Sequence, residues 1–149
     1  LIVVPTENLF ISMGLGYLES EIKDFESLGQ DFSGNELART PEVSFNALAS
    51  YDFVLTDGAV ITPQIDASYT GDHYFSTEND PLAQQDAYWI ANMRLGYVSP
   101  GERYEVAMRV NNLFDEGYNV NINSLRDFGF YQVVVGAPRS WGLEMKVTF

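Results

Sequence analysis

Six segments of the chain alternate between apolar and polar residues, and this pattern limits the folds open to it. They cover residues 8–18, 42–53, 61–70, 88–97, 104–112 and 141–149. In the last segment the apolar residues are Trp141, Leu143, Met145, Val147 and Phe149, and the residues between them are small, charged or polar. Successive side chains of a β-strand point to opposite faces, so a period of two predicts strands with one apolar and one polar face. The sequence therefore predicts an all-β fold of about six strands.

The connections between these segments are of two kinds, which alternate along the chain. Residues 56–59 and 99–103 are short and contain Gly or Pro, as tight turns do. Residues 23–40, 71–86 and 115–138 are long and polar. In an antiparallel up-and-down meander, this order brings every long loop to one end of the sheet and every short turn to the other.

Two environments produce such strands, a water-soluble β-sandwich and a membrane barrel. The charged residues and glycines of the polar face suit a watery lumen and a sandwich exterior equally well. The apolar face is aliphatic in its middle and aromatic at both ends, as expected where amphipathic rings lie at two membrane interfaces. About ten residues at roughly 3.3 Å each, tilted by about 45°, span roughly 23 Å, which is close to the apolar height of an outer-membrane barrel. These features favour the membrane barrel, and the sandwich is the alternative.

The aromatic residues at the two ends of the apolar face form a predicted membrane girdle. Those expected toward the long-loop end are Tyr17, Tyr69, Trp89 and Trp141. Those expected toward the short-turn end are Tyr51, Phe53, Tyr97, Tyr104 and Phe149.

Composition removes several classes of function. The chain has 149 residues and a net charge of −13, which argues against a nucleic-acid partner because phosphates would repel it. It has no cysteine, so disulfide frameworks and thiolate metal sites are excluded. No apolar run approaches the roughly 18 residues of a membrane helix. The chain begins at Leu1, close to a predicted strand, which indicates a piece of a longer protein.

Three stretches resemble the last part of TonB-dependent outer-membrane receptors. "RVNNLFDEGYN" (residues 109–119) and "GAPRSWGLEMKVTF" (residues 136–149) resemble the final hairpin of that family, with an Asn-Leu-Phe-Asp corner, a loop, and a Pro-Arg strand that ends in Phe. "DFSGNELARTPEVSFNALASYDF" (residues 31–53) resembles the family's entry from a loop into a descending strand. The likeness spans nearly the whole chain and is most specific in its final forty residues.

The resemblance implies a barrel of 22 strands around a plug. Residues 1–149 would form the C-terminal portion of this barrel and supply its last six strands. Six strands alone are too few to close a membrane barrel, so the other strands would be needed as well. It also implies a bacterial outer-membrane location, with the long loops extracellular and the C-terminus periplasmic. The implied partners are outer-membrane lipid and lipopolysaccharide, the plug and the rest of the barrel, TonB, the barrel-assembly machinery and a small-molecule substrate.

The closing strand resembles the signal that the barrel-assembly machinery reads in such proteins. Its residues would be Leu143, Met145, Val147 and Phe149. The plainer interpretation is that Phe149 is only the last lipid-facing ring, and the two roles are compatible.

Five residues are candidates for contact with a ligand, and each has a structural alternative. His73 is the only histidine, and Tyr74 and Phe75 follow it in a long loop, where loop packing is the simpler role. Arg94 and Arg109 are predicted on the polar face, where each would meet an anionic substrate, a plug carboxylate, or a wall acid such as Glu105 or Asp66.

Two other groups of residues have plainer interpretations. The first long connection is rich in acids that would hold Ca²⁺ or simply solvate the loop, namely Glu19, Glu21, Asp24, Glu26, Asp31 and Glu36. No ordered Asp-x-Asp spacing supports Ca²⁺ there, so solvation is favoured. In "NLFDEGYN", Asn and Asp are expected to turn the chain, and Gly117 to supply conformational freedom.

No catalytic, cofactor-binding or metal-binding motif is recognisable, so the sequence predicts a protein that is not an enzyme and has no cofactor. The leading hypothesis is TonB-dependent uptake of a scarce nutrient, by family expectation a ferric siderophore. The alternatives are a passive outer-membrane channel or small barrel, and a soluble β-sandwich binding module.

Overall fold

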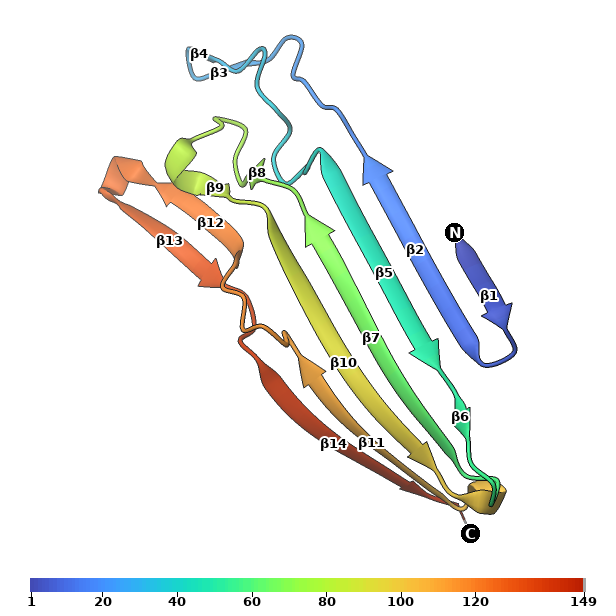
Figure 1. The fold of residues 1–149 in the computed structure, drawn as a ribbon. Coiled ribbons are helices and arrows are strands. Elements are labelled where there is room, and N and C mark those ends of the chain that lie inside the picture. The colour runs from blue at the N-terminus through green and yellow to red at the C-terminus, as the bar shows by residue number, and fades with distance from the viewer. Residues whose placement is uncertain (149) are drawn as a thin grey trace.

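The computed structural model describes residues 1–148, and its main body is one curved antiparallel sheet (Figure 1). The strands of this sheet run in the order β1-β2-β5-β7-β10-β11-β14. Their bounds are Ile2–Thr6 for β1, Leu9–Tyr17 for β2, Val43–Tyr51 for β5, Val60–Thr70 for β7, Tyr88–Val98 for β10, Tyr104–Asn111 for β11 and Ser140–Val147 for β14. The short strand β6 (Phe53–Val54) pairs with the lower end of β7. The all-β antiparallel meander predicted from the sequence is confirmed.

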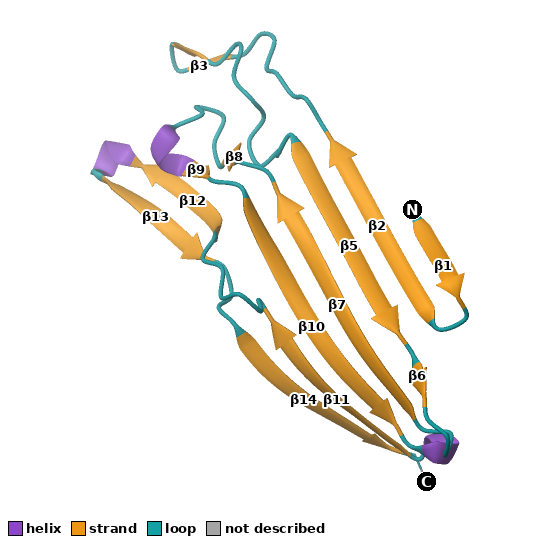
Figure 2. Ribbon diagram, in the orientation of Figure 1, coloured by secondary structure: helices purple, strands orange, loops and turns teal. Residues whose placement is uncertain are grey.

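The two ends of the sheet differ as predicted. The short turns and the C-terminal end of β14 lie at one end, and the long connections lie at the other (Figure 1). The strands dominate, and the 3-10 turns η1 (Pro81–Ala83), η2 (Pro100–Glu102) and η3 (Arg126–Phe128) lie in the connections (Figure 2). Within residues 1–148, no helix is long and apolar enough to cross a membrane.

The structure has strands that the sequence did not predict. β1 forms a hairpin with β2 through a third short turn, so seven main strands replace the predicted six. The long connection 115–138 was predicted as a loop, but it contains the hairpin β12 (Asn119–Leu125) with β13 (Phe130–Val135). Two-residue strand pairs also form in the other long connections, β3 (Glu26–Ser27) with β4 (Gln30–Asp31) and β8 (His73–Tyr74) with β9 (Gln84–Gln85).

The register brings the apolar positions of neighbouring strands onto one face. Across the middle of the sheet, Met13 lies opposite Ala47, and Ala47 lies opposite Ala67. On the other side, Leu95 lies opposite Met108, and Met108 lies opposite Leu143. A shift of one residue in any pair would move a whole set of side chains to the wrong face, so this agreement from β2 to β14 defines a continuous apolar face.

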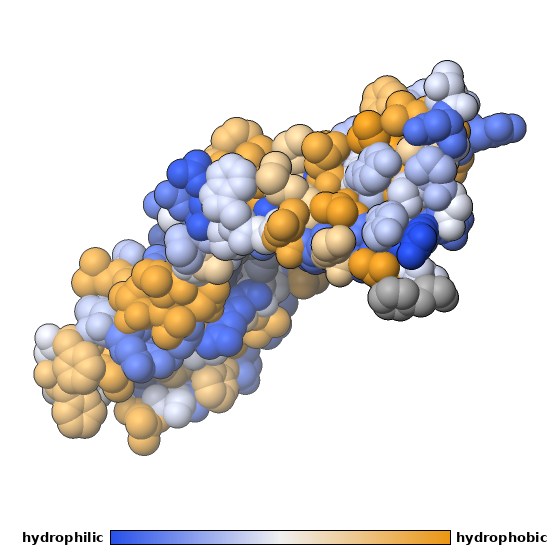
Figure 3. All heavy atoms as spheres, turned by 90° about the horizontal axis from the view of Figure 1, so that it is seen from below, coloured by the Kyte–Doolittle hydropathy of each residue, from blue (hydrophilic) through white to orange (hydrophobic). Residues whose placement is uncertain are grey.

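No second layer formed by residues 1–148 covers this face. Its side chains remain open, with exposed fractions of 76% for Leu15, 48% for Ile65, 47% for Met108 and 75% for Leu143. The space-filling view from below shows orange apolar groups at the surface (Figure 3). A soluble sandwich would enclose the apolar side chains of its strands between two layers. The described residues therefore lack the self-contained core that the soluble module requires.

Candidate functional site

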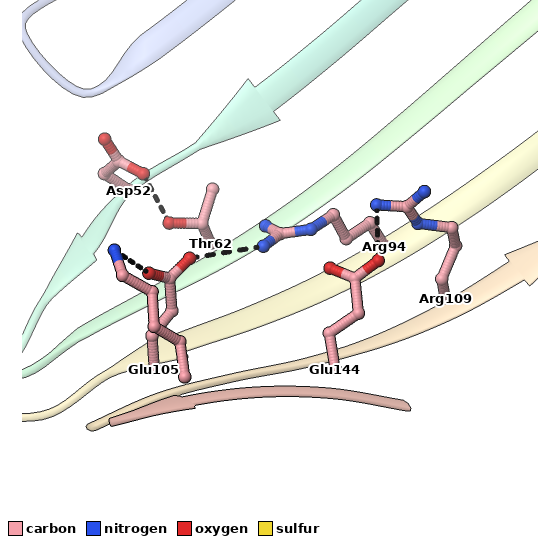
Figure 4. A network of polar contacts seen from close by, with 7 residues as sticks. Asp52, Thr62, Arg94, Glu105, Arg109 and Glu144 are labelled. Atoms are coloured by element: carbon pink, nitrogen blue, oxygen red, sulfur yellow. Dashed lines mark hydrogen bonds and ion pairs between the residues drawn. The ribbon is translucent and has the colours of Figure 1, made fainter. Parts of the chain in front are cut away.

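The polar face carries a network of charged side chains from three neighbouring strands (Figure 4). Glu105 of β11 forms ion pairs with Arg94 of β10 at 3.7 Å and with Lys146 of β14 at 3.6 Å. Arg109 pairs with Glu144 at 3.0 Å. All of these residues lie on one face of the sheet. Glu105 and Lys146 are directly opposite each other in the β11–β14 ladder, and Arg109 and Glu144 are diagonal neighbours there, whereas Arg94 lies opposite Arg109 and its side chain extends along the sheet to Glu105.

The network decides which wall acids the two arginines meet. Arg94 pairs with Glu105, one of the two wall acids considered from the sequence, and Arg109 pairs with Glu144. Asp66 instead accepts a hydrogen bond from the Nδ2 of Asn92 at 2.7 Å. Both arginines line a hollow of about 310 Å³ on the polar face. Contact of Arg94 or Arg109 with a substrate remains a prediction.

The "NLFDEGYN" stretch forms the corner where β11 leaves the sheet. Asn112, only 4% exposed, donates from Nδ2 to the carbonyl oxygens of Glu116 and Ala137 at 2.9 and 3.1 Å, and its Oδ1 accepts the Glu116 amide at 2.8 Å. Asn112 and Asp115 adopt φ of 50° and 57°, a left-handed conformation that Asn and Asp tolerate. The predicted turning role of Asn and Asp is confirmed. Gly117, expected to supply freedom, is not among the described residues with positive φ.

The same corner holds the start of the closing strand. Asp115 accepts the backbone amide of Arg139 at 2.8 Å, and the Leu113 amide donates to the Ala91 carbonyl at 2.7 Å. Gly136 lies directly under the ring of Tyr118, where an added Cβ would overlap the ring atoms. Hydrogen bonds and one close approach therefore fix how β11, the β12–β13 hairpin and β14 connect.

At the long-loop end, the β12–β13 hairpin packs against the connection that follows β7. Phe75, Ala83 and Ile122 form a small buried apolar cluster, with Tyr131 against it. Beside the cluster, Asp80 accepts hydrogen bonds from the Leu82 amide at 3.0 Å and from the Tyr131 hydroxyl at 2.8 Å. Apolar burial and a shared carboxylate therefore join the two connections.

The Asp80 carboxylate is held in its ionised form. The backbone hydrogen bond from Leu82 lowers its pKa below the ordinary value of 3.8, and the Tyr131 and Ser124 hydroxyls lower it further against the opposing effect of burial. The same bond to Asp80 raises the pKa of Tyr131 above 10.0, because it stabilises the protonated hydroxyl. The contact between Asp80 and Tyr131 is therefore favoured across the neutral pH range.

The first long connection is tied to both of the others. Asn35 donates from Nδ2 to the Thr77 carbonyl at 2.8 Å, and the Glu36 amide donates to Oδ1 of Asn79 at 2.7 Å. Arg39 donates from its backbone to the Tyr74 carbonyl at 2.7 Å and from its guanidinium to Asn121 of β12 at 2.7 Å. Three segments far apart in the sequence thus form one loop assembly, which we define as residues 18–42, 71–87 and 112–139.

A cavity of about 680 Å³ lies within the loop assembly. Phe25, Phe32 and Phe75 give it an aromatic lining, and Phe25 and Phe32 lie 5.6 Å apart between ring centroids. Its polar lining includes Ser76, Asn123 and Gln132. Polar and charged side chains, among them Glu78, Asp80 and Arg126, outnumber the apolar ones in the lining, and the volume lies in the range of small-molecule sites.

Of the three loop residues proposed from the sequence, Phe75 lines this cavity. His73 is buried, with its Nδ1 3.1 Å from the Gly71 carbonyl oxygen and its ring edge-on to Phe75 at 5.1 Å. Tyr74 is half-buried and pairs with Gln84 in the β8–β9 ladder. Whether His73, Tyr74 or Phe75 contacts a ligand remains a prediction.

The predicted girdle residues within residues 1–148 occupy one face of the sheet. At the long-loop end, Trp89 packs against Tyr69 and Phe45, with ring centroids 5.0 and 6.0 Å apart. At the short-turn end, Tyr51 and Phe53 lie 4.6 Å apart. The exposed fractions of Tyr17 and Trp141 are 65% and 67%. Phe149 lies outside the described residues, and membrane contact of the whole set stays a prediction.

Comparison with known proteins decides the family. Residues 7–113 match the family model "TonB dependent receptor-like, beta-barrel". The chain belongs to the TonB-dependent receptor family. The matched region ends within the corner, so the closing hairpin, where the sequence resemblance is most specific, is covered only by matches to solved structures.

Solved structures share the fold of this TonB-dependent receptor chain at low sequence identity. The ferric yersiniabactin uptake receptor FyuA from Yersinia pestis matches with a TM-score of 0.83 and 18% identity over 97% of this chain and 22% of FyuA. The ferric preacinetobactin receptor BauA from Acinetobacter baumannii matches with a TM-score of 0.75 and 20% identity over 97% of this chain and 20% of BauA. The ferripyoverdine receptor of the outer membrane of Pseudomonas aeruginosa matches with a TM-score of 0.69 and 18% identity over 97% and 18%. The chain thus spans about a fifth of each of these proteins.

Sequence reasoning missed most residues around the cavity. Their contacts join positions 42 to 82 residues apart, as in the bonds from Asn35 to Thr77 and from Arg39 to Asn121. The one available signal was aromatic, because Phe25 and Phe32 stand out in an acidic polar connection.

Proposed function

We propose that this chain is the C-terminal barrel portion of an outer-membrane receptor that takes up a scarce nutrient, a ferric siderophore or a similar chelate, with energy delivered through TonB. The single observation that carries the proposal is the one-layer sheet with an exposed apolar face, in a chain of this family. Exposed aliphatic strands require a covering solvent, and lipid hydrocarbon supplies it when the barrel closes. Similar solved structures include a ferric yersiniabactin uptake receptor and a ferric preacinetobactin receptor, which supports a ferric chelate as the substrate class.

In this proposal each part of the chain has a distinct task. The strands form barrel wall between lipid and lipopolysaccharide outside and the plug inside. The long loops lie on the extracellular side and capture the substrate, and the C-terminus lies on the periplasmic side. Leu143, Met145, Val147 and Phe149 provide the signal for the barrel-assembly machinery. The energised step belongs to the plug and TonB, and these residues supply the barrel wall, the loops and the assembly signal.

Uptake measurements on the full-length receptor test the proposal. Iron-starved cells that express it should accumulate a radioiron-labelled chelate, and the accumulation should stop when TonB is deleted or the proton gradient is collapsed. Uptake that continues without TonB would support the passive channel and contradict the proposal. Heat-modifiable gel migration of the intact protein provides a second readout, because a closed membrane barrel migrates differently before and after boiling.

A further inference from the structure

A chain of hydrogen-bonded side chains with a defined direction runs through the loop assembly, and its last two members, Asn123 and Gln132, line the cavity. The Arg39 Nη2 donates to Asn121 Oδ1 at 2.7 Å, Asn121 Nδ2 donates to Asn123 Oδ1 at 3.0 Å, and Asn123 Nδ2 donates to Gln132 Oε1 at 3.1 Å. A guanidinium carries donors and no acceptor, so Arg39 fixes the orientation of the first amide, and each amide then fixes the next. The direction therefore follows from chemistry rather than from the choice of amide rotamers.

This order leaves the Nε2 of Gln132 as the terminal donor of the chain. Gln132 is exposed and lines the cavity together with Asn123. Hydrogen bonds in a chain polarise one another, and a positive charge at the start strengthens the donors that follow. Gln132 consequently presents an N–H group that suits an oxygen acceptor, and it lines the same cavity as Phe25 and Phe32.

The charge of the loop assembly limits which acceptors can approach. Its residues contain fourteen of the 21 acids and four of the eight bases, so it carries −10 of the net charge of −13. A surface of one sign repels ligands of the same sign and raises the local concentration of the opposite sign. Repulsion of this kind disfavours a polyanion and leaves neutral and cationic ligands free to enter.

Together these features identify a ligand class. We propose that the cavity binds the outer surface of a neutral or cationic ferric chelate of the hydroxamate type, whose amide or hydroxamate oxygens accept from Gln132 and whose methylene groups pack on Phe25 and Phe32. A ferric tris-catecholate carries three negative charges and is disfavoured at this loop assembly. This inference rests on the proposed uptake function and adds to it the charge and the donor chemistry of the substrate.

Binding to the full-length receptor in detergent tests the class directly. The probes are a cationic ferric trihydroxamate, a neutral ferric trihydroxamate and a trianionic ferric tris-catecholate, titrated by quenching of protein fluorescence at low and physiological salt. We expect both trihydroxamates to bind at least tenfold more tightly than the tris-catecholate. Preferred binding of the tris-catecholate overturns the inference and leaves the uptake function standing. Binding of no ferric chelate overturns both.

Substitution of Gln132 tests the donor. Gln132→Glu keeps the acceptor for Asn123 and the shape of the side chain but removes the terminal N–H, so the trihydroxamate Kd should rise at least tenfold. Gln84→Glu makes the same chemical change in a neighbouring cavity, and its effect should stay below about threefold. Equal effects of the two substitutions would mean that only charge matters and would overturn the donor role.

Arg39 is a positioning residue in this scheme, and a double-mutant cycle measures its role. Arg39→Met should weaken trihydroxamate binding about threefold or more, Arg39→Lys should restore most of it, and the effects of Arg39→Met and Gln132→Glu should be strongly non-additive. Additive effects would mean that Arg39 does not act through Gln132.

Discussion

A lysine placed on the apolar face of β7 provides a quantitative test of what covers that face. Ile65 is the central residue of this 11-residue strand and is 48% exposed. A Lys at the middle of a lipid-facing barrel surface costs about 2–4 kcal/mol, and near the membrane interfaces it costs about 0–1 kcal/mol. Ile65→Lys should therefore lower the folding equilibrium constant of the full-length receptor by about 30- to 900-fold. Ile61→Lys, close to the short-turn end of the same strand, should cost no more than about 1 kcal/mol.

The adjacent residue on the opposite face is the matched control. Gln64 lies on the polar face opposite Arg94, so Gln64→Lys adds only a like-charge contact in water, worth about 0.2–1 kcal/mol. The measurement is equilibrium unfolding in guanidinium of the receptor folded into lipid vesicles. Similar penalties at positions 64 and 65 would refute the assignment of faces. A penalty at position 61 as large as that at position 65 would refute lipid as the covering medium, because a protein core has no such depth dependence.

Three further results are expected from the polar contacts of the chain. Asp80→Asn should loosen the loop assembly, and hydrogen exchange of the β12–β13 hairpin should become faster. Because the pKa of Asp80 is lowered in the folded protein, the same loosening should appear in the unsubstituted protein only as the pH falls below about 4. Unchanged exchange in both cases would contradict the role of Asp80. Asn112→Ala should destabilise the receptor by about 2–4 kcal/mol, since it removes the buried corner bonds and places alanine at φ 50°. Asn112→Gly should recover about 1 kcal/mol of this loss, because glycine tolerates the positive φ. Full recovery with glycine would mean that the hydrogen bonds contribute nothing to stability. Glu105→Gln should lower stability by less than about 1 kcal/mol, because the ion pairs of Glu105 with Arg94 and Lys146 are partly exposed. The loss should be smaller still at high salt. A larger loss that does not depend on salt would indicate a buried pair.

Alternation was sufficient to predict the sheet because each main strand separates two different environments. The period survives even where the strand contains Pro63 or Gly96, since the faces depend on the register of all strands together. β1 escaped prediction because Ile2, Val3 and Val4 are all apolar and show no alternation. In the β12–β13 hairpin, Phe130–Val135 is nearly continuous in apolar residues and gives no period-two signal. Asn119–Asn123 does alternate, but this stretch is short and lies in a long polar connection that was assigned to a loop.

The candidate site was less accessible to sequence reasoning, for a physical reason. Two of the side-chain bonds of Asn112 join it to Glu116, four residues away, so the local sequence was enough to predict a turn there. The cavity depends on amide and carboxylate contacts between connections that are distant along the chain, such as Asp80 with Tyr131. These pairings cannot be predicted from the residues on either side of each position, because the paired residues approach each other only in the folded protein.

The central claim is that lipid hydrocarbon covers the apolar face from β2 to β14, and site-directed spin labelling tests it most directly. Single cysteines introduced at consecutive positions of β10 in the full-length receptor, from Asn92 to Leu95, would carry a nitroxide in proteoliposomes. The account predicts high accessibility to oxygen at Met93 and Leu95, and high accessibility to a water-soluble nickel chelate at Asn92 and Arg94. Accessibility without this alternation, or nickel access at Met93 equal to that at Asn92, would contradict it.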